Sequence, residues 1–275
     1  MTKFSKLGAA VLLALGAVST GAYASINPVI NLSTSGSVIK WDETAPGVLT
    51  PNPAATLDSL LAGNAAAPGG NIELSKFGGP VSTLSGTVNG IAVSFDSLTL
   101  ADWQANNDSL TKSYISAAYA AALGGSVPGS LLSAAIAGFY APNAALAGKS
   151  PWQLVSDPNI SYAYYQKDPA GGASLKVGLG GLYDATNFLN ALVAGVPGAP
   201  VLTGLNQASE VVKVTYNGNT SYLYGFNATP SGVHAIDGVS YAGNYEVSLT
   251  VPEPSTLALL GVGVLGAALR RRRSV

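Results

Sequence analysis

The hydrophobic and polar positions of this chain change period along its length. Apolar and polar residues alternate over residues 83–95 and again over residues 210–226. A period of two predicts half-buried β-strands. Asn89-Gly90 interrupts the first stretch and Asn217-Gly218-Asn219 interrupts the second. Because Asn-Gly readily supplies the two positive φ angles of a type I′ turn, the pattern predicts two β-hairpins.

Further stretches on both sides of the middle section also favour strands. They are rich in β-branched and aromatic residues, and glycine, proline or asparagine bounds most of them. The predicted strands are residues 37–41, 71–74, 97–100, 159–165, 174–179 and 245–251.

The middle of the chain has a helical period. Apolar positions over residues 109–123 recur at the spacing of one helix face, and Gly124 follows them. Similar patterns predict helices over 130–139 and 185–194, and Pro151 opens a helical turn over 151–155. Strands around a helical middle section predict an α+β fold, rich in antiparallel sheet.

The first 24 residues are organised as a secretory signal peptide. Lys3 and Lys6 precede an apolar run over residues 7–18, and Ala22-Tyr23-Ala24 supplies the small-x-small cleavage pattern. We expect cleavage after Ala24. An N-terminal membrane anchor is the disfavoured alternative, because the apolar run is short and small polar residues follow it.

Residues 251–275 contain three consecutive features: a Pro-Glu-Pro segment, an uncharged run over 255–269, and four arginines. The two prolines hold Glu253 on an extended segment. As a helix the apolar run rises roughly 22 Å, short of a hydrocarbon core of about 30 Å, and snorkelling arginines cover part of the gap. We expect a single transmembrane span with a cytoplasmic C-terminus and an exported domain over 25–250.

These three features together resemble the PEP-CTERM sorting signal of Gram-negative bacteria, a resemblance confined to the tail. It implies an exosortase-type membrane transpeptidase as partner, transient anchoring in the inner membrane, and a final place at the cell surface or in an exopolysaccharide biofilm matrix. An ordinary single-span anchor is the alternative. The residues implied are Pro252, Glu253 and Pro254 as the sorting motif, with Arg270, Arg271, Arg272 and Arg273 as the cytoplasmic stop signal.

The composition of the chain is consistent with an exported protein. Between residues 25 and 251, seven lysines and no arginine stand against nine aspartates and four glutamates, a net charge of −6. A segment with this net negative charge does not favour binding to nucleic acid, which requires a basic surface. The chain has no cysteine, which excludes disulfides, thiolate nucleophiles and thiolate metal sites.

Candidate catalytic groups are few. His234 is the one histidine, and neither a Gly-x-Ser-x-Gly elbow nor a His-Glu-x-x-His motif accompanies it. A structural role for His234 is therefore favoured over a catalytic one. Asp157, Asp168 and Asp184 could gather around calcium, but turn formation is the favoured interpretation. We expect no enzyme activity, no cofactor and no metal.

Tyrosines supply the one candidate ligand face. Tyr162 and Tyr164 alternate along one predicted strand, as do Tyr222 and Tyr224 along another, so each pair shares a face. Buried, these pairs are core residues; exposed, they form a platform for sugar stacking.

The sequence thus predicts an exported, non-enzymatic surface or matrix protein that is sorted through its tail. The alternatives are a secreted carbohydrate-binding module or a secreted hydrolase with the same tail.

Overall fold

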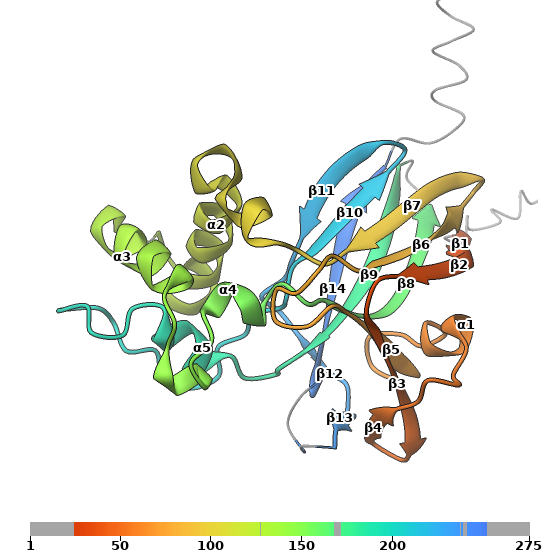
Figure 1. Cartoon of the computed structure of the whole chain (residues 1–275), viewed down its shortest axis with the longest axis horizontal. Coiled ribbons are helices and arrows are strands. Elements are labelled where there is room, and N and C mark those ends of the chain that lie inside the picture. Colours follow the sequence, from red (N-terminus) through yellow and green to blue (C-terminus); the bar gives the residue numbers. More distant parts are fainter. Residues whose placement is uncertain (1–24, 127, 168–171, 237, 239–240, 252–275) are drawn as a thin grey trace, which may run out of the picture.

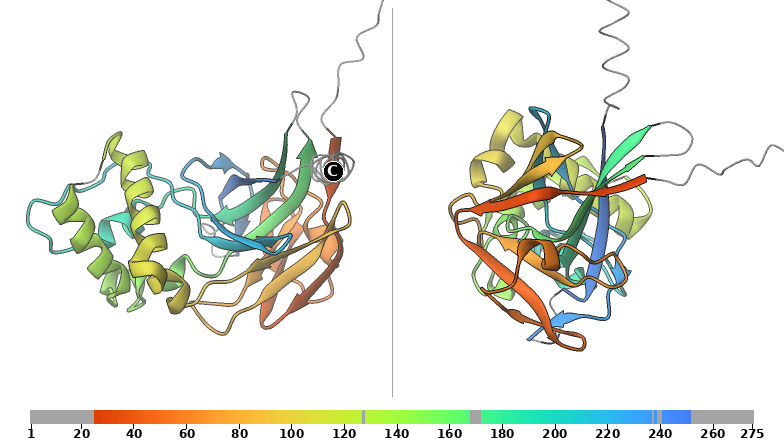
Figure 2. Two further views of the ribbon diagram at one scale, coloured as in Figure 1. Left: turned by 90° about the horizontal axis from the view of Figure 1, so that it is seen from above. Right: turned by 90° about the vertical axis from the view of Figure 1, so that its right-hand side faces the viewer.

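The structure is a computed structural model that describes residues 25–126, 128–167, 172–236, 238 and 241–251. In this part of the chain the strands form two sheets, and most of the helices gather at one side of them (Figures 1 and 2). The predicted signal peptide, sorting motif, apolar span and arginine cluster lie outside the described residues.

The larger sheet is mixed. Its strands, from one edge to the other, are β12 (Thr229–Pro230), β14 (Gly243–Thr250), β9 (Ala173–Gly181), β8 (Asn159–Lys167), β5 (Gly70–Leu74), β3 (Val38–Ala45), β4 (Val48–Pro51) and β13 (His234–Ala235). An additional strand, β1 (Ser25–Pro28), also pairs with β8. Among the described pairs of both sheets, β13 with β4 is parallel and the others are antiparallel.

The smaller sheet contains both predicted hairpins. Its order is β11 (Asn219–Leu223), β10 (Val212–Tyr216), β7 (Ile91–Asp96), β6 (Thr83–Val88) and β2 (Ile30–Ser35). Asn89 and Gly90 join β6 to β7 at φ angles of 51° and 76°, as the type I′ prediction requires. In the second hairpin Asn219 already pairs with Tyr216, so its turn is two residues long rather than three.

Apolar side chains from both sheets meet in one core. Leu84 and Val93 of the smaller sheet cluster with Ile160 and Leu175 of the larger sheet, and all four are almost fully buried. Sheet-on-sheet burial of this kind is the main favourable term that holds two layers together.

The helices after β7 build a second core. They are α2 (Leu100–Leu123), α3 (Gly129–Tyr140), the 3₁₀ turn η1 (Ala144–Leu146), α4 (Pro151–Leu154) and α5 (Thr186–Ala191), whereas α1 (Leu57–Leu60) packs against the core between the sheets. Trp103, Tyr114 and Phe139 lie at the centre of this core, with Trp103 and Phe139 ring centroids 4.8 Å apart. The β-rich, antiparallel prediction with a helical middle section is confirmed for the described part.

One local prediction in this region was wrong. Residues 97–100 are not a strand, because Thr99 caps α2 and exchanges hydrogen bonds with Asp102 in a capping box. The helix predicted over 109–123 is confirmed: residues 105–108 have non-helical backbone angles and separate it from the first turns of α2 over residues 100–104. The helix predicted over 185–194 is shorter and spans Thr186–Ala191.

No single helix of the described ranges combines the length and hydropathy of a membrane span. One bent pair, Gly129–Tyr140 with Ala144–Leu154, meets that criterion only when the two are taken together across a 47° bend.

Both ends of the described domain lie at one end of the β8–β9 hairpin. Ser25 pairs with Lys167, and Thr250 pairs with Ser174, so both partners are close to the end of β8 and the beginning of β9. Asn159, where β8 begins, marks the opposite end of this hairpin. Figure 1 shows β14 and β9 running side by side between these two ends.

Candidate ligand-binding cavity

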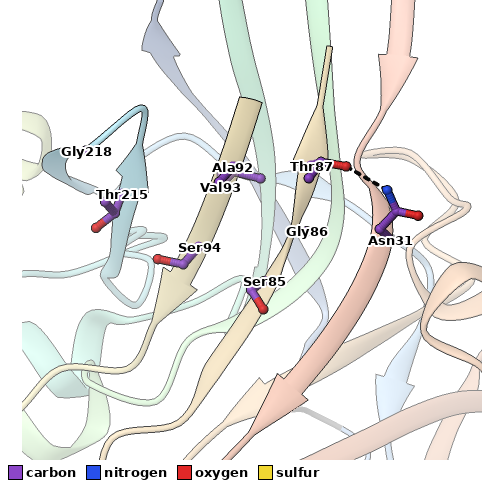
Figure 3. Close-up of a pocket in the computed structure, with 9 residues that line it drawn as sticks. All are labelled: Asn31, Ser85, Gly86, Thr87, Ala92, Val93, Ser94, Thr215 and Gly218. Atoms are coloured by element: carbon purple, nitrogen blue, oxygen red, sulfur yellow. Dashed lines mark hydrogen bonds between the residues drawn. The ribbon is translucent and has the colours of Figure 1, made fainter. Parts of the chain in front are cut away.

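One hollow is a shallow depression of about 310 Å³ on the outer face of the smaller sheet (Figure 3). A row of hydroxyl side chains crosses all five strands beside it, formed by Ser33, Ser85, Ser94, Thr215 and Thr220. The two outer pairs of the row are hydrogen-bonded, with 3.0 Å between the Ser33 and Ser85 oxygens and 3.1 Å between the Thr215 and Thr220 oxygens. No charged side chain is among the described residues that line the depression. It is an ordinary polar outer face of a sheet.

The larger hollow is a cavity of about 790 Å³ where the larger sheet meets the helical region. Its size falls within the range of small-molecule pockets, about 300–1,000 Å³. Aromatic and charged side chains line it together. They include Trp41, Phe77, Tyr183, Phe188 and Tyr241, with Glu73, Lys76, Asp157, Asn159, Asp184 and Glu210.

Sheet register places the central polar groups of the cavity. Glu73 on β5 pairs with Asn159 on β8, so the two residues share one face of the sheet. Asp157 precedes β8, and Glu210 precedes β10. Trp41 on the neighbouring strand β3 completes this wall.

Glu73 is 2% exposed and accepts hydrogen bonds from two aromatic side chains. Trp41 donates its indole N–H over 2.7 Å, and Tyr241 donates its hydroxyl over 3.2 Å, both to Oε2. The Lys76 ammonium lies 3.3 Å from Oε1. The Trp41 and Tyr241 rings are in contact, with centroids 5.4 Å apart. This carboxylate therefore fixes the orientation of the aromatic pair.

Glu210 is held by Asn159. The Asn159 backbone N–H donates to Glu210 Oε2 over 2.8 Å, and its side-chain Nδ2 lies 3.1 and 3.0 Å from the two carboxylate oxygens. The same Nδ2 also donates to the Asp157 carbonyl over 3.3 Å. Asn159 Oδ1 is buried and has no hydrogen-bond partner in the described part of the protein.

Asp157 is 5% exposed and accepts the Phe77 backbone N–H over 3.0 Å. Burial raises the pKa of the Asp157 carboxyl to about 6; the Phe77 and Lys76 groups oppose this and the Glu73 charge adds to it. Burial also raises the pKa of Glu210 well above its usual range, and the Asp157 charge adds to that shift. The cavity wall therefore carries two acids whose ionised forms the protein disfavours.

No group of three carboxylate or imidazole side chains in the described ranges is placed to hold a metal ion. Asp157 and Asp184 both line the cavity, whereas Asp168, the third residue of the calcium alternative, lies outside the described residues.

The two predicted tyrosine faces lie on different sheets and line neither hollow. The rings of Tyr162 and Tyr164 stack at 5.7 Å, and both hydroxyls donate to Glu246 over 3.2 Å. Tyr162 is 1% exposed, so its ring is core, while Tyr164 is half-buried.

The second tyrosine pair packs against the helical core. The Tyr222 hydroxyl donates to Asp102 over 3.1 Å, and the Tyr224 ring meets Tyr114 edge-on at 5.2 Å. Both tyrosines are half-buried. Their role as a ligand face stays a prediction.

His234 lies on β13 with its Nδ1 3.0 Å from the Ala235 carbonyl oxygen, and it does not line the cavity. Two acids of the cavity wall, Glu73 and Glu210, were not among the predicted site residues. A signal for Glu73 was present, because it is the single charged residue in Gly70–Leu74, a strand that is buried throughout. Glu210 offers no comparable signal, since it stands just before its strand.

Comparison with known proteins identifies the tail. The model of the PEP-CTERM protein-sorting motif matches residues 250–273, which confirms the resemblance seen in the sequence. No curated protein and no solved structure matches the chain. The match implies export and membrane-associated sorting by an exosortase-type enzyme. The individual roles of the tail residues stay predictions, for Pro252, Glu253 and Pro254 and for the four arginines. The role of Ala22 and Ala24 in signal-peptide cleavage also stays a prediction.

Proposed function

We propose that this chain is an exported, non-enzymatic surface or matrix protein that an exosortase-type transpeptidase processes at its tail. The matched sorting motif carries this proposal. It begins at residue 250, the last residue of β14, so the sorting segment directly follows the folded domain. The tail would hold the domain at the inner membrane until cleavage, and the product would reach the cell surface or an exopolysaccharide matrix.

The first test uses the four arginines of the tail. Their replacement by glutamine in Arg270–Arg273 removes the cytoplasmic stop signal, so we expect weaker retention in the membrane fraction of the native host. The matched control replaces the same residues with lysine, which keeps the positive charge. Membrane partitioning of the glutamine variant equal to that of the wild type would contradict this role.

The intact mass of the wild-type protein recovered from envelope and medium tests the processing itself. We expect loss of residues 1–24 and of the segment from the Pro-Glu-Pro motif onward, with any extra mass reporting what was attached. A single species that keeps Arg273 and stays in the inner membrane would show a permanent anchor instead.

The cavity favours a second candidate function, carbohydrate binding by the exported domain. Its wall combines partly buried aromatic rings with fixed hydrogen-bond acceptors, the combination that sugar ligands use. Retention on the host's own polysaccharide, compared between wild type and Tyr241→Ala, tests this role. Tyr140→Ala is the matched control, because Tyr140 is a half-buried tyrosine outside the cavity and outside both predicted tyrosine faces.

A further inference from the structure

We propose that the cavity binds a sugar unit that carries a protonated amine, with the ammonium group placed among Glu73, Asp157 and Glu210. This inference rests on the carbohydrate-binding role proposed above and names its ligand class. Three independent features of the cavity support it: its charge, its unpaired acceptor and its aromatic wall.

The charge of the cavity is negative and poorly compensated. Glu73 and Asp157 are almost fully buried, and Glu210 is partly buried beside them. Lys76 is the one cationic residue in the described lining, and its side chain is 49% exposed and already pairs with Glu73. A cation inside the cavity would therefore meet carboxylates that bulk water screens little.

The cavity also has an acceptor that lacks a donor. Asn159 directs its side-chain N–H groups to Glu210 and to the Asp157 carbonyl. Its Oδ1 has no hydrogen-bond partner in the described structure and is closed to solvent, and Asn159 is 2% exposed. An unsatisfied buried acceptor costs about 1–3 kcal/mol. Because Asn159 lines the cavity, a shift of its side chain would bring this acceptor to an ammonium or hydroxyl group of a ligand.

An aromatic wall stands beside these acceptors. The Trp41 and Tyr241 rings contact each other at 55°, and hydrogen bonds to Glu73 fix both side chains. Tyr241 has a φ of 66°, a backbone conformation that non-glycine residues rarely adopt. Ring faces attract both ammonium groups and the apolar face of a sugar.

The shape of the site separates an organic cation from a metal ion. The volume of about 790 Å³ suits a ligand of one or a few sugar units. Within the described residues, no three carboxylates or imidazoles are arranged to share one metal ion. The carboxylates therefore line a cavity and do not converge on a single ion position.

Binding should depend on pH. The groups that face Asp157 are Glu73 and Lys76 from β5 and the segment after it, the Phe77 amide, and Glu210 from the segment before β10. An ammonium ligand favours the ionised carboxylates, so its binding releases protons. Affinity should therefore rise as pH increases through about 6, where the Asp157 carboxyl titrates.

Isothermal titration of the full-length chain in detergent with three tetrasaccharides tests the proposal. The probes are a glucosamine tetramer, an N-acetylglucosamine tetramer and a glucose tetramer. At pH 6.5, where the sugar amines are protonated and the Asp157 carboxyl is largely ionised, we expect the glucosamine tetramer to bind at least about tenfold more tightly than the other two, a difference typical of one charged hydrogen bond. We expect the difference to shrink at pH 5, and buffers of different ionisation enthalpy should report proton release.

Variants complete the design. Asp157→Asn and Glu210→Gln keep the side-chain shape, and each should lower affinity for the glucosamine tetramer at least about tenfold. Asp58→Asn, an exposed carboxylate on α1, is the matched control and should change nothing. Circular dichroism melting checks that each variant is folded.

The outcomes distinguish carbohydrate binding from the preference for a sugar that carries an amine. Equal affinity for all three tetramers, with no effect of Asp157→Asn, would overturn the amine assignment and leave carbohydrate binding intact. Failure of all three to bind would overturn both. Mass spectrometry of the tetramers recovered after titration checks for cleavage. Shorter fragments would overturn the non-enzymatic assignment.

Discussion

Asp157 shows the cost of placing an acid in a wall that excludes water. It is 5% exposed and accepts the Phe77 amide, while Glu73 and Glu210 add negative charge nearby. Such an arrangement opposes ionisation of the carboxyl, and a fold selected for stability alone would have no reason to keep it. Residues that lower stability in this way cluster at functional sites.

A stability measurement on Asp157→Asn follows from this residue. The pKa of Asp157 is raised from 3.8 to about 6 on folding, so the folded state binds more protons and stability falls as pH rises between these values. Ionisation at pH 7.5 costs at most about 3 kcal/mol at about 1.4 kcal/mol per pKa unit. We expect urea unfolding to show the variant more stable by about 1–3 kcal/mol at pH 7.5 and nearly unchanged at pH 4. The same difference at both pH values would contradict this origin.

At the scale of elements, β9 depends on a glycine. Gly178 pairs with Tyr162 across the β8–β9 ladder and with Glu246 on β14. A Cβ atom at Gly178 would overlap the Tyr162 ring, whereas a Cβ atom at Gly180 would find its nearest neighbour at 3.6 Å, an ordinary contact. The Tyr162 ring therefore occupies the space that a side chain would take at Gly178.

Two alanine substitutions in β9 test this packing. Gly178→Ala should lower the free energy of unfolding by about 1–3 kcal/mol, because it forces the buried Tyr162 ring to move. Gly180→Ala is the matched control in the same strand and should change stability by less than about 0.5 kcal/mol. Equal losses for the two variants in thermal or urea unfolding would rule out the steric explanation.

Local turn chemistry explains which elements could be predicted. Asn89-Gly90 and Asn217-Gly218 specify hairpins through neighbouring residues alone, and the structure confirms both. The break in α2 also has a local signal, because Asn106, Asn107 and Asp108 take positive φ angles, which asparagine and aspartate tolerate, and the predicted helix begins directly after them. The two-residue strand β13 has no such signal, because it depends on β4, far away along the chain.

The cavity was beyond prediction for the same reason. Glu73, Asp157 and Glu210 come from three distant segments, which the pairing of β5 with β8 and the contact of Asn159 with Glu210 help to bring together. In the sequence alone, Asp157 is a candidate calcium ligand or turn residue, and its two carboxylate neighbours are not visible. The tail, by contrast, is a local motif and could be identified from its own residues.

At the scale of the whole molecule, the cavity and the chain ends occupy opposite ends of the β8–β9 hairpin. Ser25 and Thr250 lie near the turn of this hairpin, and Asn159 in the cavity wall lies at its other end. Eight residue steps along β8 separate the two ends, roughly 26 Å at about 3.3 Å per residue. A membrane that holds the tail would therefore lie away from the cavity.

Membrane attachment should consequently leave ligand binding unchanged. We expect the uncleaved protein in vesicles and the cleaved protein in solution to bind the glucosamine tetramer with affinities within about threefold, since no contact of the cavity involves the ends of the domain. Fluorescence titration of both forms measures this. A larger difference would show that cleavage controls access to the cavity.

The position of β14 also affects how the domain can fold during export. β14 is the last of the described strands, yet it lies inside the larger sheet between β12 and β9. Until residue 250 has crossed, β9 presents an unpaired edge, the kind of edge that promotes aggregation between chains. In the proposed sorting route the tail follows this strand directly and enters the membrane as folding is completed. Anchoring would then keep neighbouring chains apart during the step in which they are most prone to aggregate.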